Sequence, residues 1–116
     1  MSSSTLVTIA IPTFNGEAFI EAAINSAITQ TYKNLEILIV DDGSSDDTLA
    51  IAKYYSTKDE RISVIENEKN LGLVGNWNNC IQMAKGEWFQ FLFQDDLLHC
   101  KCVEKLLNIG TSLNKD

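Results

Sequence analysis

Hydrophobic residues follow two alternating patterns along the chain. Dense apolar runs at 6–11, 35–40 and 88–93 predict buried strands, and the alternating residues of 61–66 predict a half-exposed strand. After each of these runs comes a segment in which apolar residues recur at helical spacing. Helical crossovers make consecutive strands parallel. The order therefore predicts an α/β fold, with an open, mainly parallel sheet of about four strands and helices on both faces.

Individual residues predict where the first elements end and begin. Pro12 should stop the first strand, because proline has no N–H to donate to a neighbouring strand. Asn15 is a candidate N-cap of the first helix, and Ser45 is a candidate N-cap of the second. Asp46 and Asp47 are then expected in the first turn of the second helix, where the helix dipole favours acidic residues.

The later helices are indicated by apolar faces and by glycines. The third helix has one apolar face that we expect to pack on the sheet, and Gly86 is expected to close this helix. Gly110 is the expected stop of the fourth helix. The residues of the predicted packing face in the third helix are Val74, Trp77, Ile81 and Ala84.

Two pairs of adjacent aspartates follow two of the predicted buried strands. Asp41 and Asp42 come directly after 35–40, and Asp95 and Asp96 follow 88–93 through Gln94. Adjacent carboxylates repel each other unless a cation, a proton or a polar ligand relieves them. Ligands of open parallel sheets bind beyond the carboxyl ends of the strands. The two pairs therefore predict one site at that edge of the sheet.

Length and charge limit the possible functions. The 116 residues fit a single domain at 1–116, in which 1–5 and 111–116 are expected to be flexible ends. A net charge of −7 argues against nonspecific binding of nucleic acid, and a polyanionic ligand would need a metal ion to bridge it to this surface. No apolar run approaches the roughly 20 residues that span a bilayer. We therefore expect a cytoplasmic chain without a membrane segment, although its parent protein could be membrane-associated.

The three cysteines do not predict a disulfide scaffold. Cys80, Cys100 and Cys102 are too few and too unevenly spaced for one. His99 and the two later cysteines contain zinc-binding side chains, but a tetrahedral site usually needs a second cluster, and the sequence has none. Surface or helix packing is therefore the preferred interpretation of this group.

An ordered set of motifs resembles the family-2 glycosyltransferases. The motifs lie at 7–15, 30–37, 40–48, 70–72, 78, 84–87 and 94–96. The resemblance implies a GT-A fold, whose Rossmann-like half binds a nucleotide sugar, and transfer of the sugar from that donor. It also implies inversion at the anomeric carbon and use of Mg²⁺ or Mn²⁺.

The resemblance further implies which residues bind the donor, with a UDP-sugar favoured. Asp42 would accept a hydrogen bond from the uracil N–H, and the alternative role for it is turn chemistry. Phe14 would stack on the base, and the alternative is a hydrophobic staple over the first helix. Asp41 could hold its own loop in place rather than bind the donor. The implied donor-binding residues are Pro12, Thr13, Phe14, Asp42, Asn70, Gly72, Asn78 and Asp95.

The metal would be held by the second acid pair. Asp96 is the main expected ligand, with Asp95 close to the ribose or beside the metal, because hard divalent cations prefer oxygen ligands. The alternative is that these acids cap a helix beginning near Leu97. Phe93 stands where many relatives have an acid, and Trp77 stands where many have a basic residue, so we expect Trp77 to pack in the core.

The resemblance places no catalytic residue in this chain. In relatives, the acid that deprotonates the acceptor lies well beyond the second acid pair. We therefore expect an N-terminal, donor-binding part that does not turn over by itself, and the acceptor is unknown. A phospho-accepting receiver domain is an alternative, but its acid pair should follow the first strand. A non-catalytic interaction module is a second alternative.

Overall fold

A four-stranded, fully parallel sheet forms the centre of the computed structural model, which describes residues 5–113 and the side chains of 5–109. The strand order is β3-β2-β1-β4. The predicted α/β fold and parallel sheet are confirmed. In chain order, the elements are β1 (Val7–Thr13), α1 (Ile20–Ile28), β2 (Leu35–Asp41), α2 (Thr48–Ser56), β3 (Ile62–Glu66), α3 (Gly72–Met83), β4 (Trp88–Phe91) and α4 (Cys102–Leu113).

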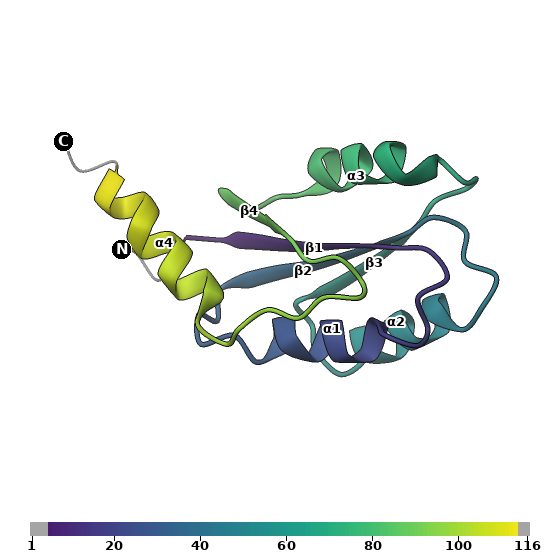
Figure 1. Cartoon of the computed structure of the whole chain (residues 1–116), viewed down its shortest axis with the longest axis horizontal. Coiled ribbons are helices and arrows are strands. Elements are labelled where there is room, and N and C mark those ends of the chain that lie inside the picture. Colours follow the sequence, from purple (N-terminus) through teal and green to yellow (C-terminus); the bar gives the residue numbers. More distant parts are fainter. Residues whose placement is uncertain (1–4, 114–116) are drawn as a thin grey trace.

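Helices cover both faces of the sheet, as predicted. Helices α1 and α2 lie on one face and α3 lies on the other, while α4 lies at the end of the sheet where β1 begins (Figure 1). No helix in the range 5–113 is long and apolar enough to cross a membrane.

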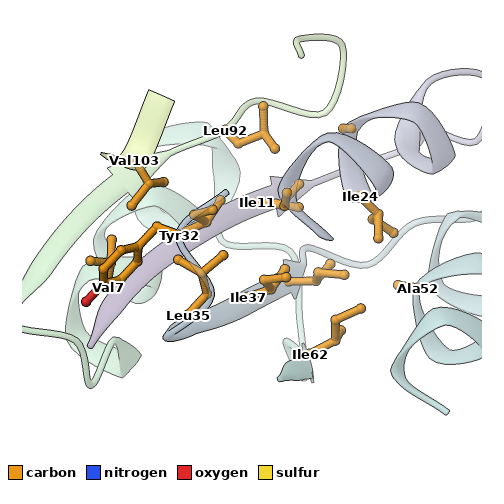
Figure 2. Packing of buried hydrophobic residues seen from close by; sticks show 14 of the residues in the cluster. Val7, Ile11, Ile24, Tyr32, Leu35, Ile37, Ala52, Ile62, Leu92 and Val103 are labelled. Carbon is orange, nitrogen blue, oxygen red and sulfur yellow. The ribbon is translucent and has the colours of Figure 1, made fainter. Parts of the chain in front are cut away.

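The main core lies between the sheet and the α1–α2 layer. Ile11, Ile24, Ile37 and Ala52 meet there, and Val103 of α4 extends the same cluster towards the start of β1 (Figure 2). A smaller cluster of Ala10, Leu38, Val40 and Cys80 lies under α3. Side chains alternate between the two faces along each strand, so a buried strand needs apolar residues at nearly every position.

Pro12 does not stop β1, which continues to Thr13 with Pro12 opposite Val40. The prediction of a stop at Pro12 was wrong because of where its nitrogen points. The Ala10 carbonyl accepts from Leu92 on the β4 side, and Pro12, two residues on, faces that same side. Strand β4 ends at Phe91, short of the predicted Phe93, so no ladder partner there needs a proline N–H.

The predicted caps of the first two helices are also wrong. Helix α1 begins at Ile20, and Asn15 instead has a left-handed backbone with a φ of 49°. Helix α2 begins at Thr48, so the acids at 46 and 47 precede the helix and Ser45 does not cap it. Asp46 accepts hydrogen bonds from both the backbone N–H and the hydroxyl of Thr48. These hydrogen bonds hold the pKa of Asp46 below its ordinary value.

The predicted packing face of α3 is wrong for Val74 and Ile81, whereas Ala84 packs against the smaller cluster. Val74 and Ile81 are 62% and 54% exposed, whereas Asn76 and Cys80 are buried against the sheet. The Asn76 amide is satisfied there because it donates to the Val40 carbonyl at 3.1 Å, so a polar residue can occupy the interior.

The two glycines expected to end helices have other positions. Helix α3 ends at Met83, and Gly86 lies beyond it, where an added Cβ would come within 2.6 Å of the Thr8 backbone nitrogen. Helix α4 continues through Gly110 to Leu113, since glycine weakens a helix without breaking it. Of the flexible ends predicted at 1–5 and 111–116, residues 1–4 and 114–116 lie outside the described residues, and 111–113 belong to α4.

The loop after β4 is fastened to the end of α1. The fully buried Gln30 donates to the His99 carbonyl at 2.7 Å and accepts from the Val103 N–H at 3.1 Å. Leu98 donates its N–H to the Ser26 hydroxyl. Through these bonds, α1 fixes the segment that follows the second acid pair.

Candidate functional site

A cleft of about 400 Å³ opens at the carboxyl ends of the strands. It lies where the strand order reverses, because β1 is flanked by β2 on one side and by β4 on the other. Loops diverge at such a point and leave a crevice for a ligand. The cleft is lined by Pro12, Thr13, Phe14, Asp42, Asn70, Gly72, Leu73, Asn76, Trp77, Phe93, Gln94 and Asp95.

The cleft contains all the implied donor-binding residues except Asn78. It joins one residue of each acid pair, Asp42 and Asp95, although they are far apart in the sequence. Asn78 lies on α3 and is exposed outside this lining. The predicted convergence of the two acid pairs is therefore observed for one member of each pair.

Asp41 is buried and holds the loop that follows β2. One carboxylate oxygen accepts from the Thr13 hydroxyl at 2.9 Å and the Ser44 hydroxyl at 2.6 Å. The other accepts from the N–H groups of Gly43 and Ser44. Gly43 has a φ of 85°, which glycine adopts without strain. Asp41 thus performs the turn chemistry that was the alternative role for Asp42.

Asp42 is 3% exposed and fastens the loop between β3 and α3. Its Oδ1 accepts from the Asn67 amide at 2.9 Å and from the Leu71 N–H at 2.7 Å, and its Oδ2 accepts from the Gly72 N–H at 3.0 Å. A carboxylate offers about four acceptor positions. One position, on Oδ2, therefore stays open on the side chain that lines the cleft.

The β3–α3 loop is ordered by side-chain amides. Asn70 donates to the Asp42 carbonyl at 2.9 Å and accepts from the Gly72 N–H at 3.0 Å. Asn67 bridges Asp42 and Asn76, with its amide 2.8 Å from the Asn76 Oδ1. Gly72 has a φ of 82°, so the entry into α3 uses a conformation that favours glycine. These side-chain amides bond to backbone groups of the loop that would otherwise have no partner, and the ordered loop forms one wall of the cleft.

Phe14 provides an exposed aromatic surface at the mouth of the cleft. Its side chain is 47% exposed, and the α1 cap lies five residues later at Phe19. A staple residue directly precedes the cap, so the staple alternative for Phe14 is wrong. Thr13, by contrast, is only 1% exposed, with its hydroxyl bound to Asp41.

The second acid pair is exposed in the loop after β4. Asp95 lines the cleft, while Asp96 lines a neighbouring depression beside Leu97 and Leu98. Neither carboxylate has a hydrogen-bond or ion-pair partner within the described part of the chain. The capping alternative is wrong, because the next helix begins only at Cys102. Both carboxylates are therefore free to meet a ligand.

Sequence reasoning missed part of the lining. Leu73, Asn76, Phe93 and Gln94 were not expected to line the cleft, and Trp77 was expected in the core. The Trp77 and Phe93 rings lie 5.3 Å apart and form an aromatic wall. The Trp77 Nε1 is buried without a hydrogen-bond partner among the described residues. The signals for Gln94 were its place in the motif at 94–96 and its adjacency to Asp95.

The cleft contains acidic but no basic side chains. Asp42 and Asp95 line it, and neither lysine nor arginine appears in its described lining. Within residues 5–109, no three histidine, cysteine or acidic side chains form a group that could hold a metal ion. In the segment at 99–102, Cys100 is exposed and the ring nitrogen of His99 accepts from the Lys101 N–H.

A crevice of this kind, at the switch point of an open parallel sheet, is typical of nucleotide-binding α/β proteins. The profile of glycosyl transferase family 2 matches residues 8–114. The chain belongs to this family. Membership confirms the resemblance seen in the motifs and excludes the receiver-domain alternative.

Relatives with similar sequences are longer proteins. An uncharacterised glycosyltransferase of Rickettsia prowazekii is 42% identical over 115 residues, which cover 97% of this chain and 35% of the relative. The glucosyltransferase WfaP of Escherichia coli, named for transfer from UDP-Glc to GlcNAc-diphosphoundecaprenol, is 44% identical over 91 residues, covering 78% of this chain and 36% of WfaP. The chain spans about a third of the length of these relatives.

Solved structures share the fold. TarS of S. aureus (residues 1–349), crystallised with UDP, superposes with a TM-score of 0.83 at 28% identity, covering 91% of this chain and 32% of TarS. The mannosyltransferase PcManGT of Pyrobaculum calidifontis, in complex with GDP-Man and Mn²⁺, superposes with a TM-score of 0.79 at 24% identity, covering 93% and 32%. The GT-A fold expected from the sequence is confirmed.

Proposed function

We propose that this chain is the donor-binding part of an inverting glycosyltransferase and that its cleft binds a UDP-sugar together with Mg²⁺ or Mn²⁺. The observation that carries the proposal is the convergence of Phe14, Asp42 and Asp95 on one cleft at the switch point of the sheet. UDP in the TarS structure and UDP-Glc in the name of WfaP support uridine as the base.

The nucleoside is proposed to lie between the β1 loop and the wall formed by α3. Phe14 offers an exposed ring on which a base can stack, a contact worth about 1–3 kcal/mol in nucleic-acid binding proteins. The open acceptor position on Asp42 suits the ring N–H of uracil, which adenine and cytosine lack. Pro12, Thr13, Asn70 and Gly72 shape the pocket mainly through backbone, because the Thr13 hydroxyl and the Asn70 amide are already used.

The cation is proposed to bind with the diphosphate rather than before it. Asp95 and Asp96 supply unpartnered carboxylates, which are suitable ligands for Mg²⁺ or Mn²⁺, and phosphate oxygens and water complete such shells. The bound ion would neutralise the charge that develops on the departing diphosphate. The placement of Asp95 in the cleft and of Asp96 beside it makes both of them candidate ligands. Asn78, which is exposed on α3, contributes least to the proposal.

We further propose that the chain binds donor in the cytoplasm without completing transfer. Its relatives are about three times as long, which supports an acceptor site and a general base elsewhere in such proteins. The acceptor stays unassigned. Incubation with labelled UDP-sugars and candidate acceptors would overturn this part of the proposal if transfer were robust.

Calorimetric titration with UDP, in the presence and absence of Mn²⁺, tests the proposal. We expect Mn²⁺ to strengthen UDP binding at least about tenfold, because an acidic cleft repels a bare diphosphate. Asp95→Ala or Asp96→Ala should remove this Mn²⁺ dependence, whereas Asp47→Ala, which changes an exposed acid outside the cleft, should not. Unchanged melting with UDP and Mn²⁺, and no heat of binding, would favour a non-catalytic interaction module instead.

A further inference from the structure

Gln94 makes a two-point contact with the backbone of Phe14. The Phe14 N–H donates to the Gln94 Oε1 at 2.9 Å, and the Gln94 Nε2 donates to the Phe14 carbonyl at 3.0 Å. The side-chain amide thus satisfies both backbone groups of Phe14, as a neighbouring strand would. The two residues lie 80 positions apart in the sequence. This contact joins the loop after β1 to the loop after β4 across the cleft.

Gly16 provides the space in which the Gln94 amide lies. A Cβ added at Gly16 would be closer than 3.0 Å to the Cδ, Oε1 and Nε2 atoms of Gln94. Gly16 is not among the glycines with positive φ, so its backbone does not require glycine. The absence of a side chain at position 16 is therefore explained by the Gln94 amide.

The other side of the same loop is held by residues around the start of α2. Asn15 donates its N–H to the Ser44 hydroxyl and accepts from the Ser45 N–H, each at 2.8 Å. Gly16 donates to the Thr48 hydroxyl at 2.8 Å. These bonds hold residues 15 and 16, whereas the Phe14 backbone is held by the Gln94 side chain. The exposed Phe14 ring is thus oriented by one amide side chain.

We propose that Gln94 is a positioning residue for nucleotide binding: its amide fixes the Phe14 backbone so that the ring meets the nucleobase. Gln94 directly precedes Asp95, so the same side chain sets the aromatic surface relative to the second acid pair. A nucleotide that spans both groups would meet them at a fixed separation. This inference rests on the proposed function of the cleft and adds a residue that the family motifs did not assign to the donor.

The test is a double-variant cycle on UDP affinity in the presence of Mn²⁺. Gln94→Ala should weaken UDP binding about five- to tenfold, and Phe14→Ala about tenfold or more, since base stacking contributes about 1–3 kcal/mol. In the Phe14→Ala background, Gln94→Ala should cause no further loss, because its effect passes through the ring. An equal loss in both backgrounds would show a general structural effect and would overturn the proposal.

Gly16→Ala is a second, independent way to separate the Gln94 amide from the Phe14 backbone. The added methyl group should displace the Gln94 amide and weaken UDP binding as much as Gln94→Ala does. The Gly16→Ala, Gln94→Ala double variant should be no weaker than either single variant, because the short side chain of alanine at position 94 does not reach the space beside residue 16. Additive losses would contradict the arrangement. Gln82→Ala, which removes an exposed amide of α3 outside the cleft lining, serves as the matched control and should bind UDP normally.

A second measurement separates failure of this inference from failure of the proposed function. The exchange rate of the Phe14 amide proton, measured by NMR without nucleotide, should rise in Gln94→Ala because its acceptor is removed. If the native chain bound no UDP, the proposed function would fail, and the positioning role would fail with it even where exchange responded. If UDP bound but exchange were unchanged in Gln94→Ala, only the positioning role would be refuted.

Discussion

Replacing Asp42 with asparagine should destabilise the fold because both carboxylate oxygens hold the β3–α3 loop. They accept from the Asn67 amide and from the N–H groups of Leu71 and Gly72. An asparagine amide has a single acceptor oxygen, and its NH₂ group would face at least one of these donors. At least one of these donors would then lose its bond to the carboxylate and face an NH₂ group, and the Gly72 N–H would keep only the Asn70 Oδ1 as its acceptor.

The magnitude follows from the kind of hydrogen bond that is lost. Bonds to a charged group contribute about 1.5–3 kcal/mol, and an unsatisfied buried donor costs about 1–3 kcal/mol. With Asp42 only 3% exposed, water replaces the lost acceptor poorly. We expect Asp42→Asn to lower the free energy of unfolding by about 2–4 kcal/mol. For a chain of this size that corresponds to a fall in Tm of roughly 10–20 °C.

Urea unfolding followed by circular dichroism measures this change. Asp95→Asn is the matched control, since Asp95 lines the same cleft but is exposed and has no partner within the described residues. Its unfolding free energy should stay within about 0.5 kcal/mol of the native value. If Asp42→Asn were as stable as Asp95→Asn, the loop would not depend on the carboxylate, and the bonding scheme described for Asp42 would be refuted.

Two further predictions concern ionisable groups away from the cleft. The Arg61 guanidinium, hydrogen-bonded to Asp59 at 2.8 Å, lowers the pKa of Asp59, so this pair should stabilise the fold above about pH 4 and lose its effect as the pH falls further. Asp59→Asn should therefore lower the free energy of unfolding, measured with urea at pH 7, by about 1 kcal/mol. The difference in this free energy between the variant and the native chain should shrink towards pH 3. A difference that stayed constant with pH would contradict the ionic contribution. Burial raises the pKa of the Cys80 thiol to about 11, so iodoacetamide at pH 8 should label the exposed Cys100 and spare Cys80 until urea unfolds the chain. Peptide mass spectrometry measures the labelling of each cysteine. Equal labelling of the two in the native state would contradict this prediction.

The fold could be predicted because its two central strands, β1 and β2, are buried on both faces. Residues such as Ile9, Ile37 and Ile39 leave no doubt that β1 and β2 are central, and the helices between strands require parallel pairing. The sequence was less informative about α3, where hydrophobic Val74 faces outward and Asn76 faces the sheet. Hydrophobicity alone cannot identify such a face, because exposed apolar residues are common and a buried amide needs only suitable partners.

The candidate site could be predicted where motif residues follow strands. Phe14, Asp42 and Asp95 line one cleft, as their positions after β1, β2 and β4 indicated. Gln94 could not be assigned a role in advance, because its partner lies 80 residues away and its space depends on Gly16. Local sequence placed Gln94 in a motif beside Asp95, but it could not identify partners that only the tertiary structure creates.

The position of β1 between β2 and β4 also has a consequence for the order of assembly during folding. The lining of the cleft includes residues from the end of β1 and from the loop after β4, which are far apart in the sequence. Strands β1, β2 and β3 can pair while the later residues are still emerging from the ribosome, but the Phe14–Gln94 contact closes a loop of 80 residues. The cleft is therefore completed late, after the sheet has gained its fourth strand.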